Sequence, residues 1–140
     1  MKDKYFIDTN ILVYSFDDSQ PHKKEIALAL IADAQQSENG IISWQVVQEF
    51  LNVSTRKFKT PLKPDDAKIY LQRVLGPVCK VFPGVELYQS ALEIMQQTGY
   101  SFYDSLILAG AMGGSCSILY SEDMQNGQQV NGVRIVNPFI

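Results

Sequence analysis

The stretch YFIDTNILVYSF, residues 5–16, decides how this 140-residue chain is interpreted. It places a carboxylate, Asp8, between two apolar runs, where an unpaired buried charge would be strongly unfavourable. The residues before Asp8 have the pattern of a short strand, and those after it have the pattern of a helix or turn. We therefore expect Asp8 to lie where a strand ends, next to groups that compensate its charge.

Short apolar runs alternate with amphipathic segments along the rest of the chain. Helices are predicted at 22–36, 44–56, 65–75, 85–98 and 105–112, and strands at 4–7, 40–43, 78–82, 117–120 and 133–136. This alternation predicts a single α/β domain over residues 1–140, a three-layer α/β/α sandwich around a mainly parallel sheet of four or five strands. In such sheets ligands bind beyond the carboxyl ends of the strands.

Composition restricts the class of protein. Hydrophobic residues make up 46% of the chain and charged residues 19%, which is typical of a globular domain and not of a disordered one. The chain contains no apolar run long enough to span a membrane and no signal-peptide pattern, so we expect a cytoplasmic protein without membrane association. Cys79 and Cys116 lack metal-site spacing and lie in apolar segments, which indicates reduced core residues.

Four acidic residues are expected at the carboxyl edge of the sheet. Asp8 and Asp123 each follow a predicted strand. Glu49 lies in the helix after the second strand, and Asp104 precedes an almost wholly apolar helix. Each also has an ordinary explanation, because Asp104 could cap its helix, Asp8 could accept backbone hydrogens in a turn, and the other two could be solvated.

Three of these acids have apolar neighbours, which predicts partial burial. Like charges gathered there would raise one another's pKa unless a cation intervened. Carboxylate oxygens are ligands suited to Mg²⁺ and Mn²⁺, and His22, the single histidine, is expected to be solvated. The acids therefore predict a divalent metal site suited to phosphodiester hydrolysis, in which the ion lowers the pKa of a bound water.

Four segments of the chain resemble the PIN domain family, and in particular its VapC-like toxic ribonucleases. The segments are FIDTNILVY (6–14), ISWQVVQEFLNV (42–53), YSFYDSLILAGA (100–111) and ILYSEDMQNGQQVNGVRIVNPF (118–139). The resemblance implies a PIN-like fold and metal ligands that also serve catalysis at Asp8, Glu49, Asp104 and Asp123. Glu122 is the alternative to Asp123 as the last ligand.

The resemblance also implies roles for three neighbouring polar residues and for several partners. Thr9, Asn10 and Ser121 would orient the carboxylates or a phosphate oxygen, although ordinary turn chemistry is an alternative for Thr9 and Asn10. The implied activity is that of an Mg²⁺- or Mn²⁺-dependent endoribonuclease that cuts RNA as the toxin of a type II toxin–antitoxin pair. A cognate antitoxin and a homodimer are implied with it.

The net charge of −3 argues at first against an RNA substrate. Without the four proposed ligands, however, 12 basic residues face 11 acidic ones. Candidate RNA contacts are the basic residues of TRKFKTPLK, with Phe58 available for base stacking; they are Arg56, Lys57, Lys59 and Lys63. A solvated helix end is the alternative for this cluster.

Three further interpretations stay open. A catalytically silent PIN-like module would bind RNA or protein without cutting, although all four acidic positions are filled. A receiver-like phosphoacceptor is disfavoured because VRIVNPFI (133–140) supplies no lysine after the last strand. The apolar face with Tyr88, Leu92 and Met95 is either core or dimer surface, and a single amphipathic stripe favours core.

Overall fold

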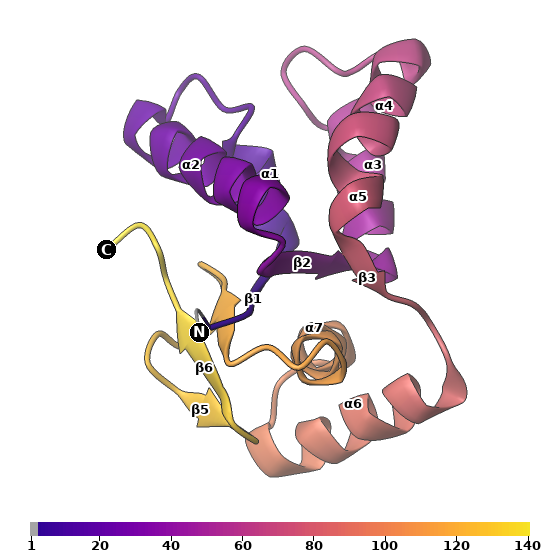
Figure 1. The fold of residues 1–140 in the computed structure, drawn as a ribbon, viewed down its shortest axis with the longest axis vertical. Helices are drawn as coiled ribbons and strands as arrows, with labels where there is room; N and C mark the ends of the chain where they lie inside the picture. Colours follow the sequence, from indigo (N-terminus) through magenta and orange to yellow (C-terminus); the bar gives the residue numbers. More distant parts are fainter. Residues whose placement is uncertain (1–2) are drawn as a thin grey trace.

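Six strands form one sheet through the centre of the molecule (Figure 1). Their order is β3-β2-β1-β4-β6-β5, and every neighbouring pair is parallel except β5 and β6. The computed structural model describes residues 3–140, so the domain predicted over residues 1–140 is seen from residue 3 onward. The strands are β1 (Tyr5–Ile7), β2 (Gly40–Ser43), β3 (Cys79–Val81), β4 (Ile118–Tyr120), β5 (Gln129–Val130) and β6 (Val133–Val136).

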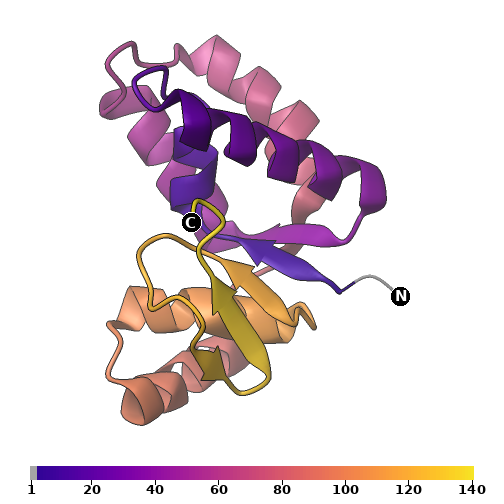
Figure 2. The ribbon, with the colours of Figure 1, turned by 90° about the vertical axis from the view of Figure 1, so that its left-hand side faces the viewer.

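Helices cover both faces of the sheet, as the three-layer prediction required. Helix α7 packs against β1, β2, β4 and β6 with α6 alongside it, whereas α1 to α5 lie on the other side of β1 and β2 (Figure 2). The helices are α1 (Thr9–Tyr14), α2 (Pro21–Ser37), α3 (Trp44–Arg56), α4 (Pro64–Tyr70), the π-helical segment η1 (Leu71–Leu75), α5 (Gly76–Val78), α6 (Val85–Thr98) and α7 (Phe102–Gly113).

Helices on both faces bury β1 and β2 along their whole length, without alternation between buried and exposed residues. Phe6 and Ile42 have no exposed surface, and Leu119 and Ile135 are buried to the same degree. Gly40 opens β2 because a Cβ there would lie 2.6 Å from the Tyr5 ring. These strands therefore hold their carboxyl ends at a fixed position in the core.

The structure confirms the α/β sandwich and corrects its details. Helices α3 and α6 have the predicted bounds, 44–56 and 85–98. The prediction of four or five strands was wrong because β5 has only two residues, too few to produce a pattern. Gly76 was also expected to end a helix, but the backbone continues through η1 into α5, where Pro77 occupies a first-turn position that tolerates proline.

Helix α7 begins three residues earlier than expected. Ser101 is its N-cap, and the Ser101 hydroxyl accepts the backbone N–H of Asp104 at 3.2 Å. The alternative role of Asp104 as the cap is therefore wrong, and its carboxylate stands in the first turn. A serine cap leaves this acid free to interact with groups outside its own helix.

The core prediction for the Tyr88 face of α6 was wrong. Tyr88 and Leu92 are exposed, and Ala91 and Ile94 are the residues of α6 that are buried. The reason is that α6 packs chiefly on α7, and only a narrow stripe of smaller side chains on α6 faces α7. Several large apolar side chains on this side of the molecule are consequently left at the surface.

Two expectations from composition can also be compared with the structure. Cys116 is buried and Cys79 is half-buried, and both are free thiols. No helix within residues 3–140 is long and apolar enough to cross a membrane.

Candidate metal and catalytic site

Asp8 lies at the carboxyl end of the central strand β1. Its backbone N–H donates to the Tyr120 carbonyl of β4 at 3.0 Å, which continues the strand pairing by one residue. Its side chain is only 6% exposed and accepts two hydrogen bonds, from the Thr9 backbone N–H at 2.7 Å and from the Ser121 hydroxyl at 2.8 Å. The adjacency of β1 and β4 therefore brings Asp8 and Ser121 together across 113 positions of sequence.

Burial dominates the ionisation of this carboxyl group. Desolvation raises the pKa of Asp8 to about 7, and the two hydrogen bonds from Ser121 and Thr9 oppose that rise. The negative charges of Glu49 and Asp123 raise the pKa further. Both other acids are thus close enough to Asp8 for their charges to act on it.

Glu49 reaches the same edge from the second turn of α3. The Ser43 hydroxyl caps this helix directly after β2, which fixes where its first turns lie. One carboxylate oxygen of Glu49 accepts the Thr9 hydroxyl at 2.6 Å, and the other accepts the Gln45 side-chain amide at 3.2 Å. Thr9 therefore touches both acids, Asp8 through its backbone and Glu49 through its side chain.

Asp104 and Asp123 form the other side of the edge. Partial burial raises the pKa of Asp104, the hydrogen bond with Ser101 lowers it, and the charge of Asp123 raises it again. Asp123 is exposed, and no hydrogen bond or ion pair engages its carboxylate within residues 3–140. Asp123 therefore acts electrostatically on both Asp8 and Asp104 while its own side chain stays free to move.

Glu122 and Asp123 are neighbours in sequence, but their carboxylates have different partners. Glu122 forms an ion pair with Lys23 at 2.5 Å and accepts the Tyr14 hydroxyl at 2.5 Å. Burial alone would raise the pKa of Glu122, but the hydrogen bonds from Lys23 and Tyr14 lower it overall. Glu122 is thus neutralised by a cation of the chain itself, whereas Asp123 is not.

The donor chemistry of this edge fits a hard divalent cation. Its side chains offer carboxylate oxygens, and the raised pKa of Asp8 is the effect that a bound cation would reverse. Asn10 adds a buried amide nitrogen that has no hydrogen-bond partner in the described part of the chain. Within residues 3–140, however, no three His, Cys, Asp or Glu side chains converge closely enough to hold an ion, so a shared metal site stays a prediction.

A comparison with protein families gives a match to the PIN domain model over residues 5–125. The chain belongs to the PIN domain family. That match includes all four acids, the strands β1 and β4 that Asp8 and Asp123 follow, and the helices α3 and α7 that carry Glu49 and Asp104.

Solved structures with the same PIN fold are similar to the chain over nearly its full length. A toxin–antitoxin complex from Klebsiella pneumoniae is 18% identical with a TM-score of 0.69, covering 96% of this chain and 98% of that one. The FitAB complex bound to a DNA fragment is 18% identical with a TM-score of 0.71, covering 97% and 96%. VapC20 of Mycobacterium tuberculosis, a toxin that cleaves the sarcin-ricin loop, is 18% identical with a TM-score of 0.61, covering 86% and 90%. None of the curated proteins matches the chain.

The predicted RNA-contact residues lie at the end of α3 and in the loop that follows it. All four are exposed: Arg56, Lys57, Lys59 and Lys63. A cavity lined by Lys57 and Lys59 shares Val13, Asp17 and Val53 with a second cavity, of about 520 Å³, which is lined by Glu49 and Asp123. Part of the basic cluster of this PIN domain therefore adjoins the acids.

Contrary to the prediction, Phe58 is not available beside these cations for base stacking. It is half-buried, with its ring centroid 5.5 Å from that of Phe16 and 6.1 Å from that of Phe50. Its ring thus closes an aromatic cluster under the loop. The basic cluster therefore presents charge without an adjacent free aromatic ring.

Sequence reasoning missed two sets of residues at this site. Lys23 and Tyr14, which hold Glu122, lie 99 and 108 positions away from it, and no local pattern links them. Gln45 stands four residues before Glu49, a helical spacing at which an amide is expected to reach a carboxylate. Only the contact of Gln45 could therefore have been foreseen.

Proposed function

We propose that this protein is a divalent-metal-dependent endoribonuclease that hydrolyses RNA phosphodiester bonds. The observation that supports this most directly is Asp8, a carboxyl group at the centre of the sheet edge whose pKa is raised to about 7 by burial and by two further acids. A buried carboxyl group of this kind destabilises the native state when it is ionised, so a contribution to stability does not explain its presence. Membership of the PIN family supports the same conclusion.

Mg²⁺ or Mn²⁺ is the proposed cofactor, held by Asp8, Glu49, Asp104 and Asp123. When bound, such an ion lowers the pKa of a coordinated water and stabilises negative charge on a phosphate. Ser121 and Thr9 hold Asp8 and Glu49 in place through the hydrogen bonds described above. Asn10 lines the adjoining cavity, and its amide nitrogen, which has no partner in the described part of the chain, would donate to a phosphate oxygen there.

Asp123, and not Glu122, is our proposed last acid. The Lys23 ammonium and the Tyr14 hydroxyl already occupy the carboxylate of Glu122. If the Glu122 carboxylate moved to bind a metal, both contacts would be broken. Asp123 has no such competing partner within the described chain, and its charge already acts on Asp8 and Asp104.

We further propose that the protein is the toxin of a type II toxin–antitoxin pair. The support comes from its full-length likeness to toxin–antitoxin complexes, among them the Klebsiella pneumoniae complex and FitAB. A cognate antitoxin would be its protein partner, and a homodimer its assembly, as the family resemblance implies. We also propose a cytoplasmic location, which an RNA substrate and two free thiols support.

The proposed RNA path runs from the acids toward the basic cluster. Lys57 and Lys59 adjoin the cavity beside Glu49, and they are flanked by Arg56 at the end of α3 and by Lys63 later in the loop. Because these side chains are exposed, they would contribute screened charge to the phosphate backbone and no sequence preference.

Cleavage of RNA by purified protein tests this proposal. We expect cutting with Mg²⁺ or Mn²⁺, none in EDTA, and at least a hundredfold loss in Asp8→Asn. Asp66→Asn, an exposed acid in the first turn of α4, is the matched control and should cut normally. Equal cutting by Asp8→Asn, or cutting in EDTA, would refute the mechanism. RNA binding without cutting under every ion would favour the silent module instead.

A further inference from the structure

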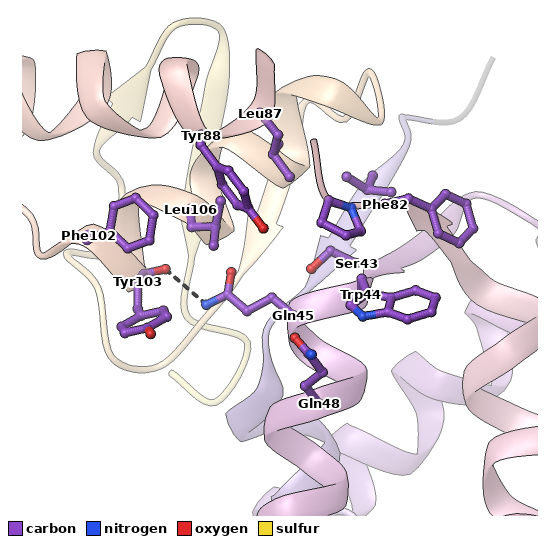
Figure 3. A pocket seen from close by; sticks show the side chains of 12 residues that line it. Ser43, Trp44, Gln45, Gln48, Phe82, Leu87, Tyr88, Phe102, Tyr103 and Leu106 are labelled. Carbon is purple, nitrogen blue, oxygen red and sulfur yellow. Dashed lines mark hydrogen bonds between the residues drawn. The ribbon is translucent and has the colours of Figure 1, made fainter. Parts of the chain in front are cut away.

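An aromatic pocket lies beside the acids and has no part in the function proposed so far (Figure 3). It is a cavity of about 390 Å³, within the size range of small-molecule sites. Its walls come from the start of α3, the loop between β3 and α6, the first turn of α6 and the first turns of α7. Its aromatic lining consists of Trp44, Phe82, Tyr88, Phe102 and Tyr103.

The pocket is built from the same two helices that carry two of the acids. Gln48 lines it and directly precedes Glu49 on α3, and Tyr103 lines it and directly precedes Asp104 on α7. Residues of the pocket wall and two of the acids therefore stand next to each other on both helices.

The lining presents ring surface and no charge. Trp44, Phe82 and Tyr103 are 46%, 59% and 65% exposed, although side chains of this kind normally seek burial. The Trp44 and Phe82 rings lie 5.9 Å apart at one side of the pocket, and the Phe102 and Tyr103 rings lie 5.5 Å apart at the other. None of the residues that line it, all of them within residues 3–140, is charged.

Gln45 places one unused polar atom at the base of this pocket. Its amide nitrogen donates to Glu49 Oε2 and to the Tyr103 carbonyl, both at 3.2 Å, which uses both of its hydrogens. Its Oε1 atom is buried and has no partner in the described part of the chain. Figure 3 shows this oxygen turned to the side of Leu106 and Tyr88. A buried acceptor is costly unless a donor reaches it, so this atom indicates a ligand with an N–H group.

We propose that this pocket binds one unpaired nucleobase of the RNA, stacked on the exposed rings and donating an N–H to Gln45 Oε1. The inference rests on the proposed ribonuclease function, for which it supplies a specificity site. Flat aromatic bases with N–H donors at their edges match both the rings and the acceptor.

Two other occupants fit less well. Phosphate groups are bound mainly by cations, and no residue that lines the pocket, all of them within residues 3–140, is charged. A second copy of this chain would cover the rings but would leave Gln45 Oε1 buried deeper without a donor, unless a polar group entered the pocket. The continuity with Glu49 and Asp104 favours a segment of the same RNA that the acids hold.

Trp44 is the only tryptophan of the chain, so its fluorescence reports on this pocket directly. We would titrate the full-length protein, in EDTA to prevent cutting, with single-stranded oligoribonucleotides of adenine, cytosine and uracil and with a guanine-containing one. At least one should quench the tryptophan emission in a saturable way. Tyr103→Ala should weaken that binding at least about fivefold. Leu28→Ala, at a residue 49% exposed on α2, is the matched control and should bind normally.

Gln45→Met tests the acceptor separately from the rings. With the base that binds tightest, we expect three- to tenfold weaker binding, about the effect of one lost hydrogen bond. The control is Gln35→Met on α2, because Gln35 is an exposed glutamine that also donates to a backbone carbonyl, that of Arg73, but does not line the pocket, so this change should not weaken binding. An equal loss in both variants would overturn the acceptor role.

Absence of quenching by all four oligonucleotides would overturn the proposal. The proposal would also be overturned if the tryptophan emission depended on protein concentration alone and light scattering showed that Tyr103→Ala dissociates a dimer. The pocket would then face a second copy of the chain. The parent function is tested independently. Base-dependent quenching without cutting in Mg²⁺ or Mn²⁺ would refute the ribonuclease function and support the base-binding pocket. Cutting without quenching would support the ribonuclease function and refute the base-binding pocket.

Discussion

The two sides of the acidic edge differ in how their carboxylates are held. On the β1 side, Asp8 and Glu49 are fixed by hydrogen bonds from Ser121 and Thr9. On the α7 side, Asp104 and Asp123 interact through charge, and no side-chain hydrogen bond joins them within residues 3–140. One side is therefore preorganised, and we propose that a bound cation would bring the acids of the other side together.

The dipeptide 122–123 repeats this contrast at the scale of two residues. Glu122 is held in place by its contacts with Lys23 and Tyr14. The ring of Phe139, near the C-terminus, packs on the other partner, Tyr14. Asp123 belongs to the α7 side, and no hydrogen bond holds its carboxylate within residues 3–140. Hydrogen bonding to the chain's own groups thus separates a structural carboxylate from a carboxylate available to a ligand.

The largest expected effect concerns the pH dependence of the fixed side without metal. The folded pKa of Asp8 is about 7 and its ordinary value is 3.8, so the native state keeps a proton that the unfolded chain releases between these values. Stability in EDTA should therefore fall as the pH rises from about 4 to about 7, by at most about 4 kcal/mol, and then level off. Urea unfolding across this range measures it. Asp8→Asn should flatten most of the slope, and an unchanged slope would contradict the assignment.

The next effect distinguishes the two acids of the dipeptide. Asp123→Asn should lower kcat/KM for RNA cleavage about a hundredfold, about 3 kcal/mol, because it removes an acid from the cluster. Glu122→Gln should leave kcat/KM within about threefold and lower stability by about 1 kcal/mol through the loss of its ion pair. Steady-state kinetics and thermal unfolding of both variants measure this. The opposite ranking would make Glu122 the ligand.

A third effect tests whether the hydrogen bond from Ser121 organises the fixed side. Ser121→Ala removes the hydroxyl that donates to Asp8, and we expect tenfold to hundredfold weaker Mn²⁺ binding by calorimetry. Ser15→Ala is the matched control, since this serine is also buried but donates to the Leu12 carbonyl. Equal losses of Mn²⁺ affinity in the two variants would show that the effect is general destabilisation.

The smallest expected effect concerns Asp104, on the α7 side. Partial burial and the charge of Asp123 raise the pKa of Asp104, so the ionised form costs stability when no cation is present. Asp104→Asn should stabilise the metal-free protein at neutral pH by a few tenths of a kcal/mol, limited by the favourable helix N-terminus. It should also reduce the rise in Tm that millimolar Mg²⁺ gives the wild type. A destabilised variant with an unchanged Mg²⁺ response would place Asp104 outside the site.

Local patterns were enough to predict the elements that carry the acids. The periodicity of α3 and α6 gave their bounds, and the strand before Asp8 was read from three apolar residues. The shift at α7 shows the limit of this reasoning, because both Ser101 and Asp104 are good caps and the backbone selects between them. The two-residue β5 lies below the length at which any period can be detected.

The sequence by itself determined where the four acids stand along the strands and helices of an α/β domain, since those positions depend on nearest neighbours in the chain. Tertiary structure alone decided the contacts between residues far apart in the sequence. Lys23 meets Glu122 across 99 positions, Ser121 meets Asp8 across 113, and Trp44 meets Phe82 beside Tyr103. Such contacts form because the sheet order places distant strand ends side by side, and no local propensity records that order.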